Sequence, residues 1–166
     1  FEILAENGIE NDASIFPGNR DLGGFPSFTE QKPCIIEYNG IRLNEFPIPL
    51  YPLPLLNKQI AYSGGGYFRL FPLAYIIKRM NKSAYNMCYF HIEDLLTDKT
   101  PFMNKADYEA YFKESGTLSK RLSRYFKANV GRKKALQNFD NLIQTFNFAS
   151  IKALLENNRL NHTITL

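Results

Sequence analysis

The chain has 166 residues, of which 45% are hydrophobic and 22% charged, a balance that excludes a largely disordered chain and suffices for one hydrophobic core. No apolar run approaches the roughly 20 residues that a membrane-spanning helix needs, so we expect no transmembrane segment. The formal net charge of +4 comes largely from residues 113–134, and raises the question of a nucleic-acid partner.

The first eight residues, FEILAENG, have the pattern of the end of an amphipathic helix. Phe1, Leu4 and Ala5 fall on one face, and Gly8 is expected to end the helix. The sequence begins inside this pattern and without a methionine. We therefore expect the chain to be a fragment of a longer protein.

Residues 11–33 are rich in Gly, Pro, Asp, Asn and Ser, which predicts a long irregular connection with one short strand at residues 13–16. Asp12 and the pair Arg20–Asp21 are interpreted as surface residues, with ordering of this connection as the alternative. Two β-compatible runs then flank Asn39-Gly40, a dipeptide typical of a tight hairpin. Five prolines between residues 47 and 72 favour an extended segment over a central strand.

The second half alternates helical and extended patterns. We expect a helix over residues 71–81, a strand over 85–91 that ends at His91, and a helical stretch over 104–126 with a break at Gly116. A clearer amphipathic helix follows over 131–146, with Leu136, Phe139, Leu142 and Ile143 as its core stripe. A short strand at 146–150 and a terminal helix at 150–156 complete this order, which is typical of an α/β domain.

The stretch YSGGGYFRLFP, residues 62–72, places three glycines before a predicted helix. Helix and following strand run in opposite directions, so the start of the helix and the end of the strand share one face. Gly64–Gly66 and His91 are therefore expected to lie close together. A structural turn remains the alternative for the glycines, and a hydrogen bond to a backbone carbonyl the alternative for His91 as an acid or base.

The segments DASIFPGNRDLGG, EFPI, SGGGYFRLFP, YFHIEDL and FNFASIKALLE resemble, in this order, the C-terminal half of bacterial polysaccharide deacetylases of the branch found with extracellular polysaccharide synthesis. The resemblance covers residues 1–156. It implies an α/β fold, a partial distorted (β/α) barrel with a β-hairpin insertion and C-terminal helices. It also implies a hydrolase that removes acetyl groups from amino sugars with a divalent metal, commonly zinc.

The family residues that map onto this chain are few. His91 in YFHIED matches the strand-end histidine that acts as the acid, although Ile92 and Glu93 replace the Pro-Trp of many members. The glycine stretch matches the family's GGGYFR and is a candidate for substrate binding through Gly64, Gly65, Gly66, Tyr67 and Arg69. The family's metal ligands have no counterpart here, so the parent protein is expected to hold the metal and this fragment to hold none and to be inactive.

The resemblance also implies a domain organisation. Residues 1–158 form the C-terminal part of the barrel, with a loop and hairpin insertion at 17–62 and a helical insertion at 98–130. Residues 159–166 form a polar tail that we expect to be frayed, with His162 solvated. The partner is an acetylated polysaccharide or oligosaccharide, and exposed sheet edges give self-association as a possibility. The compartment, cytoplasm or cell envelope of a bacterium, stays open.

Two other hypotheses remain. A non-catalytic relative of the deacetylases could bind polysaccharide through Tyr62, Tyr67 and Phe68. The basic residues of 113–134, interleaved with Tyr125 and Phe126, could bind nucleic acid. We favour a solvated helix face with the aromatic rings turned inward, and expect no nucleic-acid partner. Cys34 and Cys88 lack the spacing of a zinc site and are interpreted as buried, reduced thiols.

Overall fold

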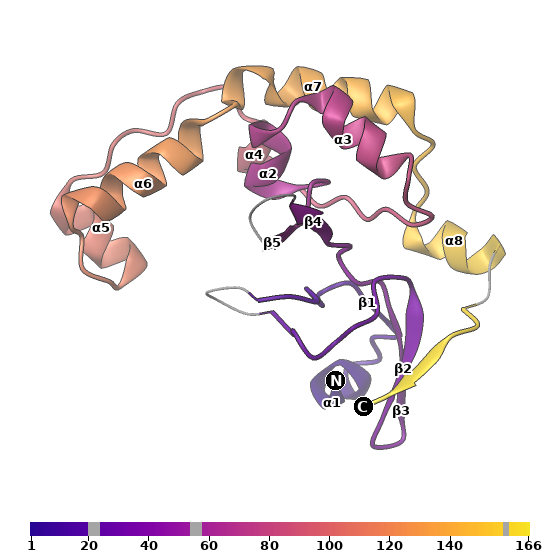
Figure 1. Ribbon diagram of the computed structural model, residues 1–166. Coiled ribbons are helices and arrows are strands. Elements are labelled where there is room, and N and C mark those ends of the chain that lie inside the picture. Colours follow the sequence, from indigo (N-terminus) through magenta and orange to yellow (C-terminus); the bar gives the residue numbers. More distant parts are fainter. Residues whose placement is uncertain (20–23, 54–57, 158–159) are drawn as a thin grey trace.

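The computed structural model describes residues 1–19, 24–53, 58–157 and 160–166, and shows a mixed α/β chain in two layers (Figure 1). One layer holds a sheet and the first helix, and the other holds helices stacked on the far side of a small two-stranded ribbon. The strands are β1 (Asn11–Asp12), β2 (Cys34–Tyr38), β3 (Ile41–Glu45), β4 (Tyr51–Leu53), β5 (Lys58–Ile60) and β6 (Thr163–Thr165). The helices are α1 (Glu2–Glu6), α2 (Gly65–Leu70), α3 (Leu73–Met80), α4 (Ile92–Leu95), α5 (Lys105–Phe112), α6 (Leu118–Asn129), α7 (Arg132–Thr145) and α8 (Ile151–Asn157).

The main sheet has the order β1-β3-β2-β6. Its centre is the predicted hairpin of β2 and β3, and the prediction is confirmed at the turn, where Asn39 and Gly40 both take the left-handed conformation (φ 48° and 78°). Such a turn follows the right-handed twist of the strands it joins. The helix at the N-terminus is also confirmed, with Gly8 in the left-handed region after its last turn.

Two predictions about this sheet are wrong. The early strand lies at Asn11–Asp12, not at residues 13–16. The Asp12 carboxylate accepts the N–H groups of Ala13 and Ser14, which are then not available to a neighbouring strand. The tail is not frayed: β6 pairs in parallel with β2 at the sheet edge, so the polar threonines of β6 hold an edge position. Arg20 and Asp21 lie outside the described residues.

The helical layer has its own core. Tyr62, Phe68, Ile76, Met80 and Leu142 are buried together with Ile60 of β5. The helix after Pro72 and the long helix α7 are confirmed. The predicted stripe of α7 is only half right. Leu142 is fully buried and Phe139 partly so, whereas Leu136 and Ile143 are each 46% exposed.

Two further predicted strands do not form. Residues 85–91 make only an isolated parallel bridge, between Tyr89 and Gly64, because the segment on the other side coils into α2 directly after that glycine. Residues 146–150 are irregular. The extended, proline-rich stretch is confirmed in part as the ribbon β4–β5.

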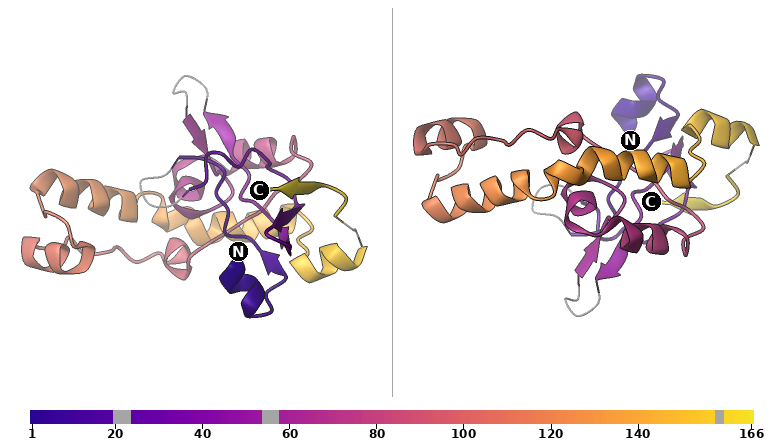
Figure 2. Two further views of the ribbon diagram at one scale, coloured as in Figure 1. Left: turned by 90° about the horizontal axis from the view of Figure 1, so that it is seen from below. Right: turned by 90° about the horizontal axis from the view of Figure 1, so that it is seen from above.

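Helices α5 and α6 form an arm that extends beyond the helical layer, as the two further views also show (Figures 1 and 2). The break at Gly116 between them is confirmed. Within the described residues neither sheet closes into a barrel, and the partial barrel and the domain boundaries stay predictions. A helix with the length and apolarity to cross a bilayer is not found in the part of the chain that the structure describes.

Candidate functional site

The predicted proximity of the glycines and the histidine is confirmed. Gly64 forms the bridge with Tyr89, and the Gly65 N–H donates to the Tyr89 carbonyl at 3.2 Å. Because His91 follows Tyr89 by two residues, it begins α4 beside α2. The cause differs from the prediction, since the two segments run parallel at this point instead of packing as an antiparallel helix and strand.

A close contact at position 64 and the backbone conformation at position 65 each favour glycine. A Cβ on Gly64 would lie 2.1 Å from the Tyr89 carbonyl oxygen, and Gly65 has φ +56°, a left-handed conformation that side chains disfavour. Both are buried, and Gly66 is half-buried. Substrate binding by Gly64, Gly65 and Gly66 stays a prediction, but the Gly65 N–H is already used inside the protein.

An ion pair fixes the backbone of His91. The Arg69 guanidinium lies 3.3 Å from Asp94 Oδ1, and both side chains are 7% exposed. Asp94 Oδ2 accepts the His91 N–H at 3.1 Å, and the Asp94 N–H donates to the His91 carbonyl at 2.9 Å. The start of α4 is thus clamped on both sides, while the His91 residue itself is exposed at the surface.

Arg69 also holds the end of α6. Its Nη1 donates to the Ala128 carbonyl at 2.7 Å and its Nη2 approaches the Lys127 carbonyl at 3.4 Å. Carbonyls at a helix C-terminus are unpaired within the helix and favour a cation. Arg69 therefore joins α2, α4 and α6. This arrangement fits a positioning residue, and its predicted contact with substrate stays untested.

The aromatic residues of the glycine stretch differ sharply in exposure. Tyr62 and Phe68 are fully buried, so the hypothesis that they stack on a sugar is wrong. Tyr67 is 40% exposed on α2, and Ile92 on α4 is 85% exposed. Tyr67, His91 and Ile92 are thus exposed side chains at this junction, and we call them the rim.

A divalent metal does not fit the residues described. In the part of the chain that the structure describes, no group of three or more His, Cys, Asp or Glu could hold a metal ion. Cys34 is buried and Cys88 half-buried, both as free thiols, and burial raises the pKa of each to about 11. The second histidine, His162, is largely exposed but lies 3.2 Å from the Glu30 carboxylate.

A buried carboxyl group, which the sequence analysis missed, lies at the end of β3. Glu45 is fully buried, its Oε1 accepts the Ile15 N–H at 3.3 Å, and its Oε2 has no hydrogen-bond partner among the described residues. Burial, and secondarily the nearby Asp12 carboxylate, raise the pKa of Glu45 to about 8. The sequence contains a signal for the burial of Glu45, because alternation along β3 puts it on the same face as the buried Leu43.

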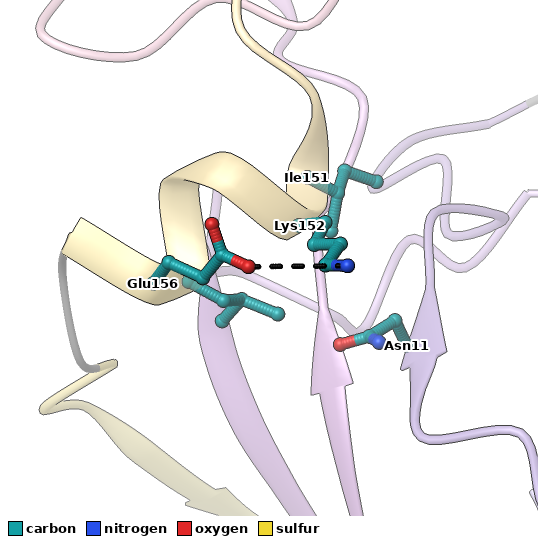
Figure 3. Close-up of a pocket in the computed structure, with 5 residues that line it drawn as sticks. Asn11, Ile151, Lys152 and Glu156 are labelled. Atoms are coloured by element: carbon teal, nitrogen blue, oxygen red, sulfur yellow. Dashed lines mark ion pairs between the residues drawn. The ribbon is translucent and has the colours of Figure 1, made fainter.

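A separate groove lies between β1 and α8 (Figure 3). It has a volume of about 610 Å³ and is lined by Asn11, Ile151, Lys152, Leu155 and Glu156. Lys152 and Glu156 approach each other to 4.0 Å along one side of α8. None of these lining residues belongs to the predicted site, and α8 follows the end of α7 that is remote from α4 (Figure 1).

Comparison with known proteins gives one match. No curated protein and no solved structure matches the chain. A family model described as a domain of unknown function, DUF3473, matches residues 13–156, a span that contains the glycine stretch, the Arg69–Asp94 pair, His91 and the arm. The chain therefore belongs to this family, the domain of unknown function DUF3473.

Proposed function

We propose that this chain is the C-terminal part of a metal-dependent polysaccharide deacetylase, and that the rim supplies its general acid. The resemblance of the glycine stretch and of YFHIED to deacetylase motifs supports this function. The observation that carries it is the clamp at α4, where the buried Arg69–Asp94 pair fixes the backbone of an exposed histidine beside the glycine stretch.

Deacetylation requires a general acid, and His91 can act as one. Water adds to the acetyl carbonyl, the C–N bond breaks, and the departing sugar amine must gain a proton. An imidazole titrates near neutral pH and can donate that proton. Its position depends on the Arg69–Asp94 pair, because one carboxylate oxygen of Asp94 holds Arg69 and the other holds the His91 N–H.

The remaining parts of the rim suit a sugar. The ring of Tyr67 offers a flat surface for the apolar face of a pyranose, and Ile92 extends that surface beyond His91. Arg69 acts through Asp94 as a positioning residue. The metal ligands belong to the rest of the parent protein, because the described residues of this chain do not form such a set. The chain alone is therefore inert in this proposal.

The test is acetate release from acetylated chitooligosaccharides in the presence of divalent metal. The 166-residue chain should release none, and a form extended with its natural upstream sequence should release acetate. His91→Asn in the extended form should lower kcat about 100-fold or more, and His162→Asn, the matched control, should leave it unchanged. Acetate release by the short chain, or full activity of His91→Asn, would refute the proposal.

A non-catalytic, polysaccharide-binding relative is the alternative, and the exposed Tyr67 and Ile92 favour it, since they offer a surface for sugar without any chemistry. The same extended form decides between the two. Binding of the oligosaccharide that is lost in Tyr67→Ala, without acetate release under any metal, would support the alternative.

A further inference from the structure

The arm, residues 105–129, carries an apolar side that the described structure covers only in part. Helix α6 has 12 residues and buries none of them. Leu118, Leu122 and Phe126 recur every four residues, which places them within an arc of about 80° on one side of the helix. They are 58%, 38% and 65% exposed.

The other side of α6 packs against α5 through polar contacts. Arg124 donates to the Tyr108 hydroxyl at 2.9 Å and to Glu114 at 3.0 Å, and its guanidinium lies 3.8 Å from the centre of the Phe112 ring. Arg121 donates to the Met103 and Gly116 carbonyls. The two helices thus hold each other by the arginine side, and the apolar side of α6 is left facing outward.

The charge of this region is strongly one-sided. Residues 113–134 contain eight lysines and arginines and a single acidic residue, Glu114, a net charge of +7 in a chain whose total is +4. Arg132 is buried and Arg121 half-buried, but Lys113, Lys127, Lys133 and Lys134 are exposed. These lysines are available to an anionic partner.

The molecule as a whole exposes more surface than a folded chain of its size requires. Its accessible surface is 11224 Å², whereas a compact monomer of this mass exposes about 8,400 Å². The arm, which extends into solvent in all views (Figures 1 and 2), accounts for part of this difference.

Charge and apolarity together select the partner. A second copy would bring two regions of net charge +7 together, which opposes association. A nucleic acid would neutralise the lysines but leave Leu118, Leu122 and Phe126 in water. An anionic lipid surface satisfies both, since headgroups attract lysines and the region below them accepts Leu and Phe side chains.

We propose that the arm binds the surface of an anionic membrane, with Leu118, Leu122 and Phe126 inserted among the headgroups and the exposed lysines of residues 113–134 attracted to the anionic surface. The helix lies in the plane of the interface and does not cross the bilayer. The proposal is independent of the deacetylase chemistry, since it uses none of the rim residues.

The test is co-sedimentation of the 166-residue chain with vesicles of phosphatidylcholine, with and without about a third phosphatidylglycerol. The chain should bind only the anionic vesicles, and raising NaCl from about 0.05 to 0.5 M should weaken binding. Leu122→Ser with Phe126→Ser should lower the affinity about tenfold or more. Lys113→Gln with Lys127→Gln should lower it about fivefold for each lysine.

The matched control is Leu136→Ser with Ile143→Ser on α7, which removes two apolar side chains of comparable exposure outside the arm. It should bind as the unmodified chain does, and circular dichroism should show that every variant stays helical. Absence of binding to anionic vesicles, equal binding to neutral ones, or an equal loss in the control would overturn the proposal. Salt-dependent binding to a single-stranded polynucleotide without vesicle binding would overturn it in favour of nucleic acid.

Discussion

Helices α6 and α7 are neighbours in sequence and similar in pattern, yet they are used differently. Both are basic and carry apolar residues at helical spacing. Helix α7 buries Arg132, Ala135 and Leu142 and contacts α2, α3 and α4. Helix α6 buries none of its residues and contacts mainly α5, apart from the bonds of Arg69 to its last carbonyls. An amphipathic pattern therefore predicts a helix, but what covers its apolar side depends on segments elsewhere in the chain or in a partner.

The helical layer and the sheet also differ in how each accommodates a buried carboxyl group. Asp94 in the helical layer has Arg69 as its cation. Glu45 in the sheet has the Asp12 carboxylate nearby, and one of its oxygens has no hydrogen-bond partner among the described residues. One buried carboxyl group therefore has a cation as its partner, whereas burial without a cation raises the pKa of the other. The predictions below test these two contrasts.

The largest effect is expected at Arg69, which joins α2 and α4 to the end of α6. Arg69→Met removes the cation from the buried Asp94 and the donors from the end of α6. It should lower the free energy of unfolding by about 3–5 kcal/mol in urea denaturation, because it leaves an uncompensated charge. The double variant Arg69→Met with Asp94→Leu should recover much of that loss. Arg42→Met on the exposed side of β3 is the control, with no expected change. A single variant as stable as that control would contradict the role of the pair.

The contrast between the apolar sides of α6 and α7 can be measured directly with one substitution in each. Leu142→Ala should cost about 2–5 kcal/mol because Leu142 is fully buried. Leu118→Ala on α6 should cost less than about 1 kcal/mol, because Leu118 is 58% exposed. Both substitutions remove the same side-chain atoms from a helix. If the m value stays constant, the difference between their urea midpoints therefore measures the difference in burial of the two leucines. Equal losses would mean that α6 is covered in solution by a second copy.

Gly131 lies in the short link between α6 and α7, and the conformation of this link depends on it. It has φ +72°, and a Cβ there would lie 2.1 Å from the Arg69 carbonyl oxygen. Gly131→Ala should cost about 2 kcal/mol or more, from the left-handed backbone and the contact together. Gly8→Ala is the control, since Gly8 has φ +70° but nothing within 4 Å of its Cβ position. Its smaller cost, about 1 kcal/mol, isolates the backbone strain. Equal costs would show that the contact with the Arg69 carbonyl oxygen adds nothing to the effect of Gly131→Ala.

Sequence reasoning succeeded where the signal is local. Asn39-Gly40, Pro72 and Gly116 each mark a turn or a helix end through their own backbone preferences, and the structure has those boundaries. It failed where the outcome depends on a distant partner. Residues 85–91 have a strand-like composition, but only Gly64 pairs with them. The polar residues of β6 become a strand because β2 offers an edge.

The candidate site shows the same division. The proximity of Gly64 and His91 was predicted from a helix and a strand that run in opposite directions, but a parallel bridge between Gly64 and Tyr89 produces it. Arg69 was predicted as a residue that binds substrate. Its bonds to the α6 carbonyls join residues 58 and 59 positions apart, and such contacts leave no periodic signal. Glu45 is the intermediate case. Its alternation with Leu43 places it on the inward face, but glutamate is usually found at the surface, so the pattern did not single it out.

The last prediction concerns Glu45 and pH. Its pKa is raised from 4.5 to about 8 in the fold, so between these values the folded chain keeps a proton that the unfolded chain releases. Stability should therefore be highest below this window and fall by about 1 kcal/mol per pH unit as pH rises from 5 to 8. Four groups face the Glu45 carboxyl: the Asp12 carboxylate, the Ile15 N–H, the Cys34 thiol and the Tyr85 hydroxyl. In the described residues they include no cation that would hold it ionised.

Glu45→Gln keeps an oxygen for the Ile15 N–H and cannot ionise, so its stability should be nearly constant across the same window. Glu37→Gln, on the exposed side of β2, should keep the slope of the unmodified chain. Urea denaturation at pH 5, 6, 7 and 8 measures all three proteins. A flat profile for the unmodified chain, or an unchanged slope in Glu45→Gln, would show that Glu45 is ionised in the fold. That result would require a cation from outside the described residues, and the contrast with Asp94 would disappear.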